Sequence, residues 1–185
     1  MIWPLFGRRP RSDTISILYG TIVAQARLPE FYRDYGVADT INGRFDLIIL
    51  HLTMVLGRLG REPTLAGLGQ SLFDRFCRDM DDNLREMGVG DLSVPKEMRR
   101  MGEAFYGRAQ AYRDALASAS DEAFVEAIGR NVYGGIPSDK DAPRRLAIYV
   151  RQALRDLDHQ GSERLSRGTI DFPDPLSVLV GRIEA

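Results

Sequence analysis

The chain has 185 residues, of which 44% are hydrophobic and 28% charged, so it is long enough and apolar enough to enclose the core of one domain. Its 25 basic and 26 acidic residues almost cancel, which argues against a direct nucleic-acid partner. The single cysteine, Cys77, excludes an internal disulfide and any zinc site built on several thiolates. We therefore expect one globular domain in a reducing compartment.

The pattern of residues 1–11 predicts an amphipathic, basic tail ahead of the first helix. The tail is too short and becomes charged too early for a cleaved secretory signal, so we expect it to be retained. Aromatic rings suit the headgroup region of a membrane, and arginines are attracted to an anionic leaflet. The residues assigned to this membrane-surface contact are Trp3, Phe6, Arg8, Arg9 and Arg11. The alternative is a frayed terminus without a binding partner.

From residue 12 to about residue 160, apolar residues recur every three or four positions. This spacing predicts an all-α, single-domain bundle of six or seven helices. Asp13 is expected to cap the first helix, and Pro29 to open a short helical turn. Residues 42–60 are apolar around nearly the whole helix, which places that helix at the centre of the bundle. No segment approaches the roughly 18 consecutive apolar residues of a membrane span, so we expect none.

The second half of the chain continues this pattern. We expect a helix over residues 65–87 with its apolar positions as far as Met87 facing inward, a long helix that begins near Ser93, another that begins at Ser120, and a last one over 142–159. Beyond residue 160 the periodicity fades, which predicts an irregular tail over 161–185. Pro173 and Pro175 are expected to prevent regular structure there, although apolar residues 176–180 can dock as a short strap.

Candidate catalytic groups are few. Two histidines and one cysteine match no compact catalytic signature, and His51, on the most apolar helix, favours a hydrogen-bonded core histidine over a partner contact or a metal or haem ligand. The best lead for an enzyme is the acidic run over residues 79–82, because clustered carboxylates can hold Mg²⁺. However, each of Asp74, Arg75 and Asp81 lies four positions before a residue of opposite charge, which favours ion pairs along a solvated helix face. We expect no catalytic residue, metal or cofactor.

The start of the most apolar helix is unusual, because charged Arg44 and Asp46 flank Phe45. One interpretation is a structural clamp in which the arginine bridges neighbouring helix ends through carboxylates. The other is a surface that faces a partner, where arginine is enriched.

Several segments resemble the ubiquinol–cytochrome c chaperone family. They are Gly-Val-Ala-Asp-Thr over 36–40, Gly-Arg-Phe-Asp over 43–46, Leu-His-Leu over 50–52 and, above all, Asp-Met-Asp-Asp-Asn-Leu-Arg-Glu-Met-Gly-Val-Gly-Asp over 79–91. Gly107-Arg108 with Tyr112, and Arg130-Asn131, continue the likeness, which covers about residues 15–155.

The resemblance implies a helical chaperone without enzymatic chemistry that assists biogenesis of the cytochrome b subunit of ubiquinol–cytochrome c reductase. Mitochondrial members bind nascent cytochrome b near the ribosome with a helper protein, and whether this chain shares either contact stays open. Residues 1–11 are too short for a mitochondrial presequence, which favours a bacterial cytoplasmic protein that works peripherally at the inner membrane.

Two hypotheses follow. In the first, the chain binds newly made cytochrome b through a polar surface. The residues expected there are Arg44, Phe45, Asp46, Asp79, Asp81, Asp82, Arg85, Glu86 and Asp91. In the second, it is an all-α metal-dependent enzyme that acts on a polyprenyl or quinone-like substrate through the carboxylates of residues 79–82.

Overall fold

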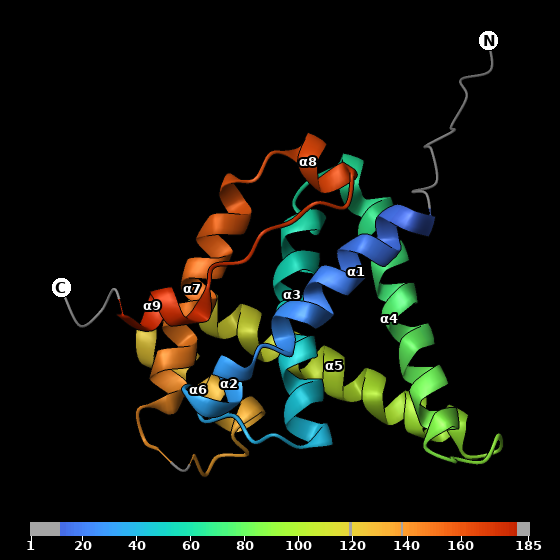
Figure 1. The fold of residues 1–185 in the computed structure, drawn as a ribbon, viewed down its shortest axis with the longest axis horizontal. Coiled ribbons are helices and arrows are strands. Elements are labelled where there is room, and N and C mark those ends of the chain that lie inside the picture. The colour runs from blue at the N-terminus through green and yellow to red at the C-terminus, as the bar shows by residue number, and fades with distance from the viewer. Residues whose placement is uncertain (1–11, 119, 138, 181–185) are drawn as a thin grey trace.

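The computed structural model describes residues 12–118, 120–137 and 139–180, and every regular element in these ranges is helical (Figure 1). The six long helices are α1 (Ser12–Ala26), α3 (Ile41–Gly60), α4 (Ala66–Glu86), α5 (Val94–Ala117), α6 (Asp121–Val132) and α7 (Ala142–His159). The short ones are α2 (Pro29–Arg33), α8 (Ser162–Ser166), α9 (Pro175–Val180) and a 3₁₀ turn, η1 (Pro63–Leu65). The prediction of an all-α domain with six or seven helices is confirmed.

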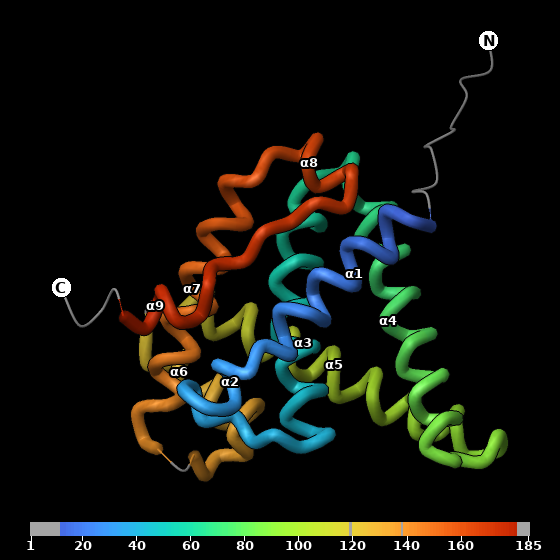
Figure 2. The backbone as a smooth tube through the Cα atoms, viewed as in Figure 1, coloured from blue at the N-terminus to red at the C-terminus, as the bar shows by residue number. Residues whose placement is uncertain are grey.

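Helix α3 runs through the middle of the bundle (Figure 2) and contacts all five of the other long helices. Its apolar side chains are buried around most of its circumference, with Leu47, Ile49 and Leu52 completely inaccessible to solvent. A helix that is apolar on nearly every side finds enough apolar partners only at the centre of a bundle. The expected position of residues 42–60 is therefore the observed one.

The start of α3 is fixed by two local features. The Thr40 hydroxyl oxygen accepts a hydrogen bond from the Gly43 backbone N–H at 3.1 Å and caps the helix. The first helical residue is Ile41, one residue before the predicted start at residue 42. A Cβ atom on Gly43 would lie 2.0 Å from the Ala38 carbonyl oxygen, so only glycine lets the preceding loop pack this closely. This loop and the helix start therefore form one rigid corner.

Helices α4 and α5 form a hairpin joined to α3 by an aromatic cluster. Phe76 of α4 stacks on Phe45 with ring centroids 6.3 Å apart and lies 5.8 Å from Phe105 of α5. Gly88, at φ 81°, follows the end of α4, where glycine takes the left-handed conformation without a steric cost. Met87, predicted to face inward, is 55% exposed, because α4 ends at Glu86 and the chain turns away before Met87 reaches the core.

The C-terminal segment contains two short helices and folds back over the bundle. Pro175 does not prevent regular structure: it opens α9, because the first turn of a helix needs no backbone N–H from that residue. Asp174 accepts hydrogen bonds from the backbone N–H groups of Leu176 and Ser177 and caps this helix. Val178 and Leu179 pack against the core, whereas Leu176 and Val180 are exposed, so only half of the expected apolar strap docks.

Replacement of Leu52 with alanine tests the central position of α3. The loss of a fully buried leucine should lower the free energy of unfolding by about 2–5 kcal/mol, measured by urea denaturation. The matched control is Leu92→Ala, because Leu92 is 100% exposed and its loss should change the free energy by less than about 0.5 kcal/mol. Equal effects of the two substitutions would contradict the central position.

Candidate functional site

The acidic block of the sequence, residues 79–91, lies on the last turns of α4 and the turn that leads into α5. Asp79 at its beginning is partly buried: one carboxylate oxygen accepts a hydrogen bond from the Tyr19 hydroxyl at 2.8 Å, and the other lies 3.6 Å from the Arg75 guanidinium. Burial and this hydrogen bond raise the pKa of the Tyr19 phenol. Asp79 therefore holds α4 against α1.

Arg85 organises the end of the hairpin. Its Nε lies 2.6 Å from Asp81 one helical turn earlier, and its Nη1 contacts the carboxylate of Asp91 in the turn. One guanidinium thus links the last turn of α4 to the loop that follows. Arg85 and the two carboxylates that it contacts, Asp81 and Asp91, are all residues expected at the partner surface.

Asp82 and Glu86 are the two carboxylates of this block that remain available. Both are exposed on α4, four residues apart, and neither forms an ion pair or side-chain hydrogen bond within residues 12–118, 120–137 and 139–180. Two large apolar side chains follow them in the sequence: Met87, next to Glu86, is 55% exposed, and Leu92, in the turn that leads into α5, is 100% exposed. In Figure 1 this end of the hairpin lies at the edge of the molecule opposite α9. We call Asp82, Glu86, Met87 and Leu92 the hairpin surface.

The structure argues against a metal centre on α4. No group of three or more possible ligands occurs in the part of the chain that the structure describes. Of the expected ion pairs, Arg75–Asp79 and Asp81–Arg85 are present, whereas Asp74 accepts a hydrogen bond from Gln70 instead of pairing with Arg78. Tyr19 and Arg85 already occupy Asp79 and Asp81, so the run does not offer converging carboxylates.

The second polar block, Arg44 to Asp46, does not form one surface with the first. Arg44 turns back to Asp39, with its Nε 2.6 Å from the carboxylate, and Phe45 packs on Phe76. Asp46 is only 8% exposed and lies 2.7 Å from the Arg108 guanidinium of α5. The helix clamp proposed for Arg44 is thus made by Asp46.

Burial raises the pKa of Asp46 to about 6, and the Arg108 guanidinium opposes this shift. The Nε of Arg108 and the hydroxyl of Tyr112, which lies one turn further along α5, are buried without a hydrogen-bond partner among the described residues. The contact between α3 and α5 therefore contains a buried polar seam. In the sequence, the family resemblance includes both residues, but nothing there predicts the pairing of Arg108 with Asp46.

His51 is a core histidine, as predicted. It is fully buried, and its two ring nitrogens lie 2.8 Å from the Leu47 carbonyl oxygen and 2.9 Å from the Tyr149 hydroxyl oxygen. A carbonyl only accepts, so Nδ1 carries the proton and Nε2 accepts from Tyr149. The Tyr149 oxygen in turn accepts from Gln25 at 3.0 Å, so the chain of hydrogen bonds joins α3, α7 and α1.

Burial lowers the pKa of His51 to about 4, although the hydrogen bond to the Leu47 carbonyl acts in the opposite direction. The folded state therefore prefers the neutral ring. Relative to an unfolded histidine with a pKa of about 6.5, this preference contributes stability that is fully present above pH 6.5 and is lost as the pH falls through about 4.

We expect the free energy of unfolding to fall on acidification from pH 7 to pH 4 by an amount that includes on the order of 3 kcal/mol from His51. The His51→Gln variant, which starts less stable, should lack this part of the slope. The comparison isolates His51, because Asp46 titrates in both proteins. Parallel pH profiles from urea unfolding would show that His51 is protonated as easily in the folded chain as in the unfolded one.

Residues 1–11, with the side chains assigned to a membrane surface, lie outside the described residues. In the described part of the chain, no helix combines the length and the apolar character that crossing a membrane requires.

Comparison with known proteins adds to this geometry. Residues 33–172 match the sequence pattern described as ubiquinol–cytochrome C chaperone. The chain is 26% identical over 152 residues to ubiquinol-cytochrome-c reductase complex assembly factor 1 of Xenopus laevis, covering 80% of this chain and 74% of that protein. The human protein of that name is 26% identical over 149 residues, so this chain spans half of the human relative's length (50%). The crystal structure of the Cbp3 homolog from Brucella abortus has a TM-score of 0.80 at 35% identity, covering 90% of this chain and 92% of that one.

Proposed function

We propose, from the premise that this chain belongs to the ubiquinol–cytochrome c chaperone family, that it binds newly made cytochrome b during assembly of ubiquinol–cytochrome c reductase. The family is one of assembly factors and not of enzymes. The finer step, from assembly factor to a cytochrome b chaperone, rests on the chemistry of the hairpin surface.

The observation that carries the proposal is that Met87 and Leu92 are exposed at the same end of the hairpin as Asp82 and Glu86, whose carboxylates form no ion pair among the described residues. A newly made membrane protein presents apolar segments flanked, on the side that is not translocated, by lysine and arginine. Apolar side chains edged by carboxylates match that combination. Methionine suits it further, because its flexible thioether adapts to apolar partners of different shape.

Several of the residues expected at the partner surface are engaged within the bundle. Asp46 is inside the bundle, Phe45 packs on Phe76, and Asp79 is engaged by Tyr19, so these three side chains join helices to one another and are not free for a client. Asp81, Arg85 and Asp91 hold the turn in shape. Contact with the client falls to Asp82, Glu86, Met87 and Leu92.

The Leu92→Ser substitution should lower the amount of cytochrome b that co-purifies with the tagged chaperone by roughly tenfold, the effect of about 1.4 kcal/mol at an interface. The thermal midpoint of the purified variant should not change, because Leu92 makes no core contact. The matched control is Ile136→Ser, since Ile136 is 88% exposed in the loop between α6 and α7. A decrease of the same size in the control would indicate a general effect of exposed apolar side chains.

A second arm tests the carboxylates. The double variant Asp82→Asn/Glu86→Gln should weaken cytochrome b capture at low salt and lose most of its difference from wild type at high salt. The variant with the same charge change on α6, Asp121→Asn/Glu122→Gln, should behave as wild type. If cytochrome b capture falls only in variants that also unfold, the hairpin is a scaffold and the client binds elsewhere.

We also propose that residues 1–11 hold the protein peripherally at the inner membrane of a bacterium. This step rests on the aromatic and arginine side chains of the tail alone. Removal of residues 1–11 should reduce sedimentation with anionic vesicles and leave the thermal midpoint unchanged, because it leaves in place every core side chain that the structure describes, from Ile15 onward. Equal vesicle binding by both proteins at low and high salt would exclude this anchor.

A further inference from the structure

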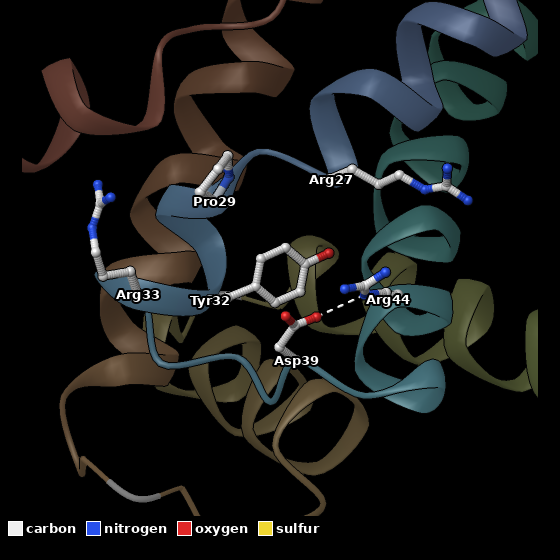
Figure 3. Close-up of a pocket in the computed structure, with 6 residues that line it drawn as sticks. All are labelled: Arg27, Pro29, Tyr32, Arg33, Asp39 and Arg44. Carbon is white, nitrogen blue, oxygen red and sulfur yellow. Dashed lines mark hydrogen bonds and ion pairs between the residues drawn. The ribbon is translucent and has the colours of Figure 1, made fainter.

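A pocket between α1, α2 and the start of α3 lies apart from the hairpin surface (Figure 3). Its volume is about 580 Å³, within the usual range for sites that bind small molecules. The residues that line it are Arg27, Pro29, Tyr32, Arg33, Asp39 and Arg44. Three arginines and one aspartate give this lining a surplus of positive charge, although the whole chain has a net charge of −1.

The walls of the pocket are built by short local contacts. The Tyr32 hydroxyl donates to the Ala26 carbonyl at the end of α1 at 2.9 Å, and this bond holds the ring between α1 and α3. The close approach of the loop at Ala38 to Gly43 brings Asp39 beside the first turn of α3. Figure 3 shows the Tyr32 ring above Asp39 and beside Arg44, with Arg27 and Arg33 on either side and their guanidinium groups directed away from the ring.

The arginines differ in what they have left to bind. Arg33 is engaged with Asp34 and Glu30. Arg44 gives only its Nε to Asp39, and within the described residues its two terminal nitrogens have no hydrogen-bond partner. Arg27 makes no side-chain hydrogen bond or ion pair in the same part of the chain. Two arginines from different helix ends therefore line one pocket and have N–H donors without a partner among the described residues.

These donors suit a phosphate group more closely than a carboxylate. A guanidinium edge offers parallel N–H groups that match two oxygens of a phosphate, and a phosphate has further oxygens for a second arginine. Arg44 also lies in the first turn of the 20-residue helix α3, whose amino-terminal end favours a negative charge. Ile41, which is 73% exposed three positions before Arg44, provides an apolar neighbour of the kind that a lipid chain could contact.

We propose that this pocket binds a phosphate group, carried either by a small soluble molecule or by a lipid headgroup. Arg27 and Arg44 hold the phosphate oxygens, Asp39 orients Arg44, and Tyr32 forms the wall. The site is independent of client binding at the hairpin surface.

The test uses the full-length protein and two probes: inorganic phosphate, and phosphatidylcholine vesicles with or without phosphatidylglycerol. Phosphate should shift the amide resonances around Tyr32 and Arg44 in a nitrogen–proton correlation spectrum. The Arg27→Gln/Arg44→Gln variant should bind phosphate at least about tenfold more weakly. The control is Arg61→Gln/Arg100→Gln, which removes the same charge at two exposed arginines, one paired with Asp158 and one with Glu97.

The vesicle probe distinguishes the sources of the phosphate, since residues 1–11 are the same in both variants. Loss of phosphate binding together with weaker sedimentation on phosphatidylglycerol vesicles supports a lipid headgroup. Loss of phosphate binding with unchanged sedimentation supports a soluble ligand. Equal phosphate affinity in the wild type and both variants, or no phosphate binding at all, overturns the proposal. If the double variant folds poorly, Arg27→Gln alone is used instead. The Arg27 side chain forms no hydrogen bond or ion pair among the described residues, so its replacement should not disturb the fold.

Discussion

The need to bury helix α3 on nearly all of its sides governs the rest of the structure. Leu47, Ile49 and Leu52 point in different directions around one helix and are all inaccessible to solvent, so other helices must pack around it. Helices α1, α4, α5, α6 and α7 do so, and the C-terminal segment completes the cover where Phe172 meets the edge of His51 at a centroid distance of 5.2 Å. The two surfaces proposed for binding, the end of the α4–α5 hairpin and the corner between α2 and α3, lie outside this packing.

The apolar core around α3 also contains buried polar side chains, which connect α3 to α1, α5 and α7. His51 with Tyr149 and Gln25 joins α3 to α7 and α1, whereas Asp46 with Arg108 joins it to α5. Apolar packing tolerates sliding, but a buried hydrogen bond or ion pair is favourable only in one register. We infer that these two contacts fix which way α3 faces among its neighbours.

The fold could be predicted from the sequence to a large extent because helical periodicity is a local property. The family resemblance and the core role of His51 are confirmed as well, and the range expected for the last long helix, 142–159, is the observed one. The candidate site was harder to predict, because it depends on which residues meet across helices. No local sequence pattern indicates that Asp46 pairs with Arg108, 62 positions later, or that Asp79 accepts a hydrogen bond from Tyr19. Met87 and Pro175 were misjudged for a related reason: a residue at the end of a helix follows the turn and not the helix.

The close packing of Gly43 against Ala38 has a consequence for how variation in this chain would act. A side chain at position 43 would displace the loop that carries Asp39 and tilt the first turn of α3, which carries both Arg44 and Asp46. One inherited change at a residue with no functional group would then disturb the phosphate pocket on one side of α3 and the ion pair with α5 on the other. Gly43 is thus a position where a mild-looking mutation would impair two separate parts of the molecule together.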